Sequence, residues 1–168
     1  MRKSIALIGI CYLLASCSPL RPLKGSYYGS ERPFTISTTK SVDEVWSKVI
    51  DLFATKGLSI KIIDKASGLI TSESFSFIGK NTNETETGTL TDPSAWIVCS
   101  VPNPGQVDGS WNVRIKKDEI GKTVININIT NLVAKTVLTP TAYVKGSTVF
   151  YEAKSTGNFE RIISDLIK

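Results

Sequence analysis

Residues 41–58, SVDEVWSKVIDLFATKGL, predict an amphipathic helix that decides the fold of the chain. Its first residues form a capping box, in which the Ser41 hydroxyl accepts a hydrogen bond from the Glu44 N–H and the Glu44 carboxylate accepts one from the Ser41 N–H. Gly57 predicts the end of the helix, because glycine adopts the left-handed position after the last turn without a Cβ penalty and lets Leu58 fold back. Apolar residues recur at helical spacing between these two signals: Val42, Val45, Trp46, Val49, Ile50 and Phe53.

A second amphipathic helix is predicted over residues 157–168. Residues 155–158 offer several candidate N-caps. Five apolar residues fall on one helical face: Phe159, Ile162, Ile163, Leu166 and Ile167.

Strand-like sequences fill the rest of the chain. They are bounded by turn residues and cover residues 33–37, 59–63, 69–78, 95–101, 110–117 and 123–132. The turn sequences DKASG (64–68) and DEIGK (118–122) predict two hairpins. Within residues 123–132, isoleucine alternates with Asn or Thr, which indicates one dry face and one wet face.

We therefore predict an α+β fold with two layers, an antiparallel β-sheet packed against two amphipathic helices in the order β-α-β-β-β-β-β-α. This single domain is expected to span residues 33–168. A chain of this length buries enough surface to need neither a metal nor a disulfide framework.

The composition excludes several classes of function. The 168 residues contain no His, so no Ser-His-Asp or Cys-His catalytic site and no His-ligated metal can form. The net charge of +5 is concentrated near the N-terminus, and residues 34–168 hold 15 basic and 14 acidic residues. Because this surface is balanced, we expect no nucleic-acid partner. We predict a non-enzymatic protein with no catalytic, cofactor or metal site.

The first residues, MRKSIALIGICYLLASC, predict a secretory signal peptide over residues 1–16. A cationic start precedes a ten-residue apolar run, which is too short to cross a bilayer as a helix. Leu14-Ala15-Ser16-Cys17 resembles the lipobox of bacterial lipoproteins, which implies a diacylglycerol on the Cys17 sulfur, an N-acyl chain and cleavage before Cys17. Several acyl chains on Cys17 hold a protein at a membrane stably, whereas one chain binds only reversibly.

Residues 17–32 are predicted to be the lipidated cysteine and a flexible tether, because residues 18–32 are rich in Pro, Gly and Ser and show no periodicity. The residue after Cys17 is Ser18, whereas an Asp at this position would resemble an inner-membrane retention signal. The tether also lacks the acidic run that would resemble a surface-export signal. These resemblances imply the periplasmic side of the outer membrane.

The domain also resembles a family. Residues 34–72, with Trp46 in the helix, the Gly57 stop and DKASGLI at 64–70, resemble the helix-grip domains of BamC-like outer-membrane lipoproteins. The sequence STGNFE at 155–160 looks like that family's entry to its last helix. The resemblance implies a helix-grip fold and carries over no catalytic residues. BamC is an accessory subunit of the machinery that inserts β-barrels, but it has two such domains where this chain has one.

Three further sets of residues are assigned from their neighbours. Cys99 lies in an apolar run and is expected to be a small buried residue, as are the tryptophans at 46, 96 and 111. The loop 80–93 is predicted to be solvated. It carries Glu84, Glu86 and Asp92, whose carboxylate oxygens would also suit a hard cation.

Residues 135–154 predict a hairpin that projects from the sheet. Tyr143, Phe150 and Tyr151 on it are candidate partner contacts, because amphipathic aromatic residues are enriched at interfaces. We expect an outer-membrane-anchored periplasmic lipoprotein that acts as an envelope assembly or interaction module with an envelope protein partner. The alternative is a tethered carrier that binds a lipid or another hydrophobic ligand in the helix-grip cavity.

Overall fold

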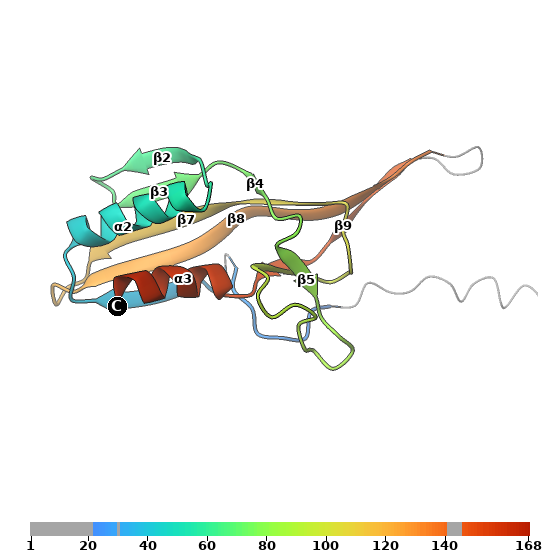
Figure 1. The fold of residues 1–168 in the computed structure, drawn as a ribbon, viewed down its shortest axis with the longest axis horizontal. Helices are drawn as coiled ribbons and strands as arrows, with labels where there is room; N and C mark the ends of the chain where they lie inside the picture. Colours follow the sequence, from blue (N-terminus) through green and yellow to red (C-terminus); the bar gives the residue numbers. More distant parts are fainter. Residues whose placement is uncertain (1–21, 30, 141–145) are drawn as a thin grey trace, which may run out of the picture.

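The computed structural model describes residues 22–29, 31–140 and 146–168 (Figure 1). The helices are α2 (Val42–Thr55) and α3 (Asn158–Ile167), and the strands are β1 (Phe34–Thr38), β2 (Ile60–Asp64), β3 (Leu69–Ser72), β4 (Phe75–Ser76), β5 (Asn81–Asn83), β6 (Ile97–Cys99), β7 (Gln106–Lys117), β8 (Thr123–Leu138), β9 (Ser147–Tyr151) and β10 (Ala153–Ser155).

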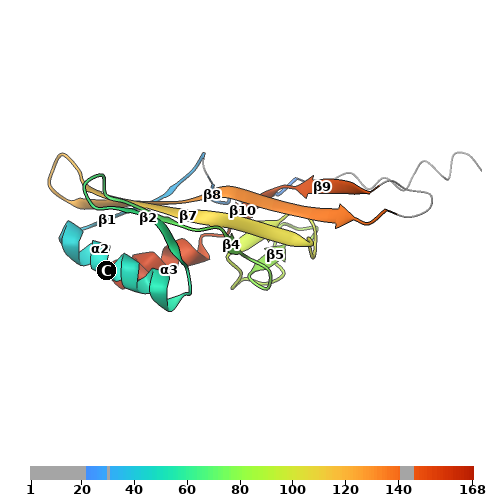
Figure 2. The same ribbon diagram turned by 90° about the horizontal axis from the view of Figure 1, so that it is seen from above.

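The main sheet has the strand order β1-β8-β7-β3-β2, and all neighbours in it are antiparallel. In addition, β4 pairs with β7 and β9 pairs with β8. Helices α2 and α3 lie together on one face of this sheet (Figure 2). The predicted α+β class, the large antiparallel sheet and both hairpins, β2–β3 and β7–β8, are confirmed.

A second, smaller sheet was not predicted. Its order is β10-β6-β5, with β10 antiparallel and β5 parallel to β6. Strand β5 lies in the sequence that was predicted to be only a solvated loop. The described chain between the two helices therefore forms more strands than the five predicted, and not all of them are antiparallel.

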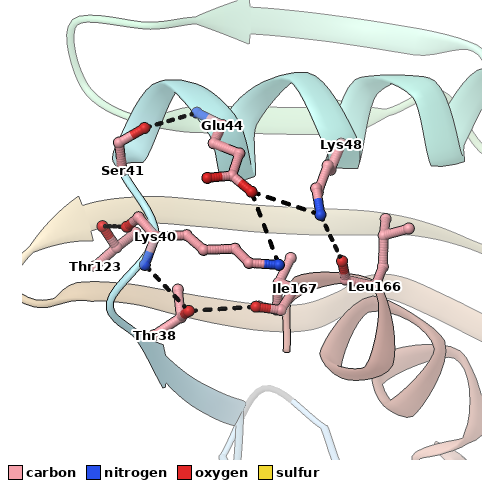
Figure 3. Close-up of polar contacts among 8 residues, drawn as sticks. All are labelled: Thr38, Lys40, Ser41, Glu44, Lys48, Thr123, Leu166 and Ile167. Carbon is pink, nitrogen blue, oxygen red and sulfur yellow. Dashed lines mark hydrogen bonds and ion pairs between the residues drawn. The ribbon is translucent and has the colours of Figure 1, made fainter.

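The ends of α2 follow the sequence signals closely. The Ser41 hydroxyl accepts a hydrogen bond from the Glu44 N–H at 3.1 Å. The Glu44 carboxylate does not return to Ser41 but lies 3.7 Å from Lys40 Nζ and 3.6 Å from Lys48 Nζ (Figure 3). Gly57 has a φ of 70°, and the Leu58 N–H bonds the Phe53 carbonyl at 2.8 Å, as predicted.

The start of α2 and the end of α3 meet at one corner of the sheet (Figure 3). Lys48 Nζ donates to the Leu166 carbonyl at 3.1 Å, and the Thr38 hydroxyl donates to the Ile167 carbonyl at 3.2 Å. These two bonds satisfy carbonyls that the last turn of α3 leaves without partners inside the helix. The two helices and β1 are thus joined by polar contacts as well as by the core.

Aromatic side chains fill the space between the helices and the sheet. The ring of Trp111 from β7 stacks on Phe159 from α3 with 4.3 Å between centroids. Phe159 also contacts Trp96 and Phe53, at 4.9 Å and 6.2 Å. Trp46, Trp96 and Trp111 are all buried, so their predicted places in the core are confirmed.

Strand β8 continues beyond its predicted end at residue 132 because a bulge interrupts its alternation. Asn131 has a φ of 53°, and the register shifts between Asp108 and Ser110 of β7. Ile125, Ile127 and Ile129 point to the core before the bulge, and Ala134 does so after it. The extra residue at the bulge shifts the inward positions from odd-numbered to even-numbered residues. Strand β8 therefore stays in the sheet after the bulge and ends six residues later than predicted.

Candidate functional site

The end of β8 and the whole of β9 form a two-stranded hairpin that projects from the main sheet, which we call the β8–β9 hairpin (described residues 134–140 and 146–151). The register pairs Ala134 with Tyr151 at its base and Leu138 with Ser147 near its turn. Strand β7 accompanies β8 only as far as Lys135. In Figure 1 the hairpin reaches beyond the other described elements, on the side away from α2.

The hairpin exposes large apolar side chains. Val137 is 63% exposed, Phe150 is 62% exposed and Leu138 is 44% exposed. Directly paired residues point to the same side of a ribbon, and successive residues point to opposite sides. Val137 and Phe150 therefore share one face, while Leu138 lies on the other.

The residues predicted to contact a partner have different positions. Phe150 is exposed on the hairpin, whereas Tyr151 is half-buried and packs against the core. Tyr143 lies outside the described residues, as does Cys17. Sequence reasoning predicted a hairpin over residues 135–154 but did not identify Val137 and Leu138, because it singled out the aromatic residues of that hairpin.

Residues 22–28, which we call the N-terminal segment, lie against the domain although the sequence placed them in a flexible tether. The Glu84 carboxylate accepts hydrogen bonds from the Lys24 N–H at 2.8 Å, the Gly25 N–H at 2.8 Å and the Tyr27 hydroxyl at 2.5 Å. Glu84 follows β5, so the unpredicted small sheet supplies the main acceptor for this segment.

A second carboxylate binds the same segment. Glu152 Oε2 accepts a hydrogen bond from the Leu23 N–H at 3.1 Å, and Glu152 Oε1 lies 3.1 Å from Lys154 Nζ. Further along, Tyr28 exchanges two backbone hydrogen bonds with Ser155 of β10, at 3.0 Å and 2.9 Å. The segment is therefore held at both ends, and its first residues lie beside the base of the β8–β9 hairpin.

These contacts change the acidity of both carboxyl groups. Burial acts to raise the pKa of Glu84, but the hydrogen bonds from Lys24, Tyr27 and Gly25 outweigh it, so this pKa is lowered. The Leu23 N–H lowers the pKa of Glu152, with a further contribution from Lys154. Both groups are thus charged when they hold the N-terminal segment at neutral pH.

A cleft of about 560 Å³ opens between the N-terminal part of the chain, the bulge of β8 and the residues after β9. Charged side chains of both signs line it: Glu31, Arg32, Glu152 and Lys154. Pockets for hydrophobic ligands are mostly apolar, so the lining does not suit a lipid chain.

The remaining candidate residues show no arrangement for chemistry. Burial raises the pKa of the Cys99 thiol to about 12, which keeps it neutral and unreactive, in line with its predicted structural role. Glu84 is occupied by the N-terminal segment, and Asp92 accepts bonds from Ser94 in a local turn. Within the described residues no cluster of three or more Cys, Asp or Glu could hold a metal ion. None of the helices among those residues is long and apolar enough to cross a bilayer.

No protein-family model matches the chain, and a search of curated proteins gave no match.

Proposed function

We propose that this protein is a lipid-anchored, non-enzymatic module of the bacterial envelope, held by acyl chains on Cys17 at the periplasmic side of the outer membrane. Its role is to meet another envelope component through the β8–β9 hairpin. The lipobox-like sequence before Cys17 supports the anchor. The BamC-like resemblance supports a helix-grip arrangement of the sheet and helices as part of the same proposal.

The single observation that carries this function is the projecting hairpin. Two-stranded ribbons are marginally stable in water, and this one exposes Val137, Leu138 and Phe150. Isolated exposed apolar residues are common, but three on one projecting element, two on one face and one on the other, form apolar surface that a partner can cover. Such a surface can meet an envelope protein or the bilayer itself. Phe150 is its described aromatic contact, and Tyr143, outside the described residues, is proposed as a second.

The carrier alternative has less support. A ligand in a helix-grip cavity needs space between the helices and the sheet, and here Trp111 and Phe159 stack on each other in that space. The cleft beside the N-terminal segment has a charged lining. No observation in the described part of the chain favours a hydrophobic ligand over a packed core.

The anchor is tested by Cys17→Ser. We expect mass spectrometry of the wild-type protein to find acyl chains on Cys17, and fractionation to move the variant from the membrane to the soluble fraction. Cys99→Ser is the matched control, since it removes the other cysteine of the mature chain and should leave the protein in the membrane. Firm membrane association of Cys17→Ser would contradict the proposed anchor.

A further inference from the structure

The tip of the β8–β9 hairpin, of which residues 136–140 and 146–150 are described, presents apolar side chains on both faces. The pairs Lys135–Phe150 and Val137–Thr148 share one face, and the pairs Thr136–Val149 and Leu138–Ser147 share the other. Phe150 and Val137 thus stand on one side, with Leu138 and the half-buried Val149 opposite. A groove on a protein covers one side of a ribbon, whereas a lipid surface surrounds both.

Charge is distributed along the hairpin in a way that suits an interface. The described residues 136–140 and 146–150 contain no charged residue, although 21% of the whole chain is charged and about two would be expected in ten residues, and Lys145 lies outside the described residues. Lys135, Glu152 and Lys154 are concentrated at the base of the hairpin. Charged groups at headgroup level and uncharged residues beyond them are the pattern of interfacial membrane elements.

The position of the anchor brings the bilayer within reach of this tip. Only five residue steps separate Cys17 from Pro22, the first described residue, so at most about 18 Å of chain joins them. Leu23 is bound to Glu152, which directly follows β9. From Glu152 to Ser147 the hairpin extends about 17 Å at roughly 3.3 Å per residue. Cys17 and the tip of the hairpin are therefore each within about 20 Å of the contact between Leu23 and Glu152.

We infer that the tip of the β8–β9 hairpin is a second membrane contact, which inserts Val137, Leu138 and Phe150 into the headgroup region of the bilayer that holds Cys17. This inference rests on the proposed function, because it takes the Cys17 anchor as given. The envelope component met by the hairpin is then a phospholipid surface, and the base lysines Lys135 and Lys154 stay at headgroup level.

The test uses the full lipidated protein in vesicles of phosphatidylethanolamine with a minority of phosphatidylglycerol. Val137→Cys introduces one reactive thiol, since Cys17 is acylated and Cys99 is buried, and an environment-sensitive fluorophore is attached to it. The matched control is Ile120→Cys, at a residue that is 76% exposed and lies in the β7–β8 turn at the opposite end of β8. The two probes differ only in position.

We expect the probe at residue 137 to shift to shorter emission wavelength and to be quenched several-fold more strongly than the probe at residue 120 by nitroxide-labelled lipids. Phe150→Asp combined with the labelled Val137→Cys variant should reduce both signals, because a charge opposes insertion. Equal solvent exposure of the two probes would overturn the inference. Protection of residue 137 only in native membranes, and not in pure lipid, would also overturn it in favour of a protein partner.

Failure of the proposed function gives a different result. If Cys17 carries no acyl chain, mass spectrometry shows this directly, and the wild-type protein does not stay with the vesicles at all. A lipidated protein that stays bound while residue 137 remains in water contradicts only the hairpin insertion.

Discussion

Glu160 is a carboxylic acid buried in the first turn of α3, with 1% of its surface exposed. Its Oε2 atom has no hydrogen-bond partner in the described part of the chain. Burial raises the pKa of Glu160, and the Ser155 hydroxyl opposes this only in part. Because the folded state holds the proton more tightly than the unfolded state, stability falls as pH rises above the ordinary glutamate value of about 4.3.

The first prediction is that Glu160→Gln stabilises the protein at neutral pH. An uncharged amide removes the desolvated charge, so the free energy of unfolding should rise by about 1–2 kcal/mol at neutral pH and change little near pH 4. Urea unfolding followed by tryptophan fluorescence measures this difference. Glu119→Gln, an exposed residue of the β7–β8 turn, is the control, and a Glu160→Gln variant equally or less stable at neutral pH would contradict the assignment.

Gly68 permits a close approach that no other residue allows. Its φ is 72°, and a Cβ placed on it would lie 1.9 Å from the carbonyl oxygen of Ile115. The Ile115 N–H also bonds the Gly68 carbonyl at 2.8 Å, so the two backbones are held together. The residue between the β2–β3 turn and β3 is thus fixed by its contact with β7.

The second prediction compares two glycine substitutions. Gly68→Ala should lower the free energy of unfolding by more than about 2 kcal/mol, because it adds a clash to the left-handed backbone cost of about 1–2 kcal/mol. Gly121 has a φ of 82° with no atom within 4 Å of a new Cβ, so Gly121→Ala should show only that backbone cost. Thermal and urea unfolding of the two variants measure the difference, and equal losses would refute the contact.

Sequence patterns predicted residues whose roles are local. The Ser41 cap, the Gly57 stop and the three buried tryptophans depend on neighbours a few positions away, and all are confirmed. The acceptor role of Glu84 depends on residues 57 to 60 positions away, so no spacing rule reveals it. Glu160 was also missed, because its burial follows from how α3 rotates on the sheet.

At the level of elements, the sequence predicted strand β8 up to the bulge and missed its continuation beyond it. The alternation of Ile125, Ile127 and Ile129 ends at Asn131, which suggests the end of a strand. In the structure Asn131 takes a left-handed conformation, which asparagine tolerates better than most residues, and the strand continues. The sequence therefore placed the end of β8 six residues too early, although it did predict a projecting hairpin over residues 135–154.

The third prediction concerns the N-terminal segment as an element. Glu84→Gln removes the charge that strengthens the bonds from Lys24 and Gly25, so the amide protons of these two residues should exchange about tenfold faster, which corresponds to ~1.4 kcal/mol. Hydrogen exchange with mass spectrometry measures this. Glu73→Gln, an exposed glutamate between β3 and β4, is the control, and unchanged exchange in Glu84→Gln would mean that the carboxylate does not hold the segment.

Acid should release the same segment. The pKa values of Glu84 and Glu152 are both lowered, so their contribution to docking is fully present above the ordinary glutamate value and is lost as pH falls through the lowered values. After correction for the intrinsic exchange rate, protection of residues 23–25 should therefore be constant near neutral pH, begin to fall at about pH 4 and be lost at lower pH.

At the level of the whole molecule, the class and layering of the fold were predictable and its second sheet was not. The helices and the main sheet follow from strong periodic patterns. The small sheet joins β5, β6 and β10, which are short and lie up to about seventy residues apart, so no local pattern marks them. Parallel pairing of β5 with β6 also needs a crossover, which the polar sequence of residues 84–96 does not suggest.

The fourth prediction is that the hairpin tip adds nothing to the stability of the fold. Replacing residues 137–148 by Asn-Gly, between the paired residues Thr136 and Val149, should change the free energy of unfolding by less than about 1 kcal/mol. The reason is that the removed side chains in the described part of the chain are exposed. Urea unfolding measures the effect, and a loss of several kcal/mol would show that the tip is part of the core.

The docked N-terminal segment also determines how the molecule would respond to tension on the proposed Cys17 anchor. A pull transmitted through Cys17 would load the bonds at Leu23, Lys24, Gly25 and Tyr28 one after another, as in unzipping, before any load reached the aromatic core. Peeling of seven residues would release about 25 Å of slack. A displacement of the membrane would then lengthen the chain between Cys17 and the domain before the domain itself was strained.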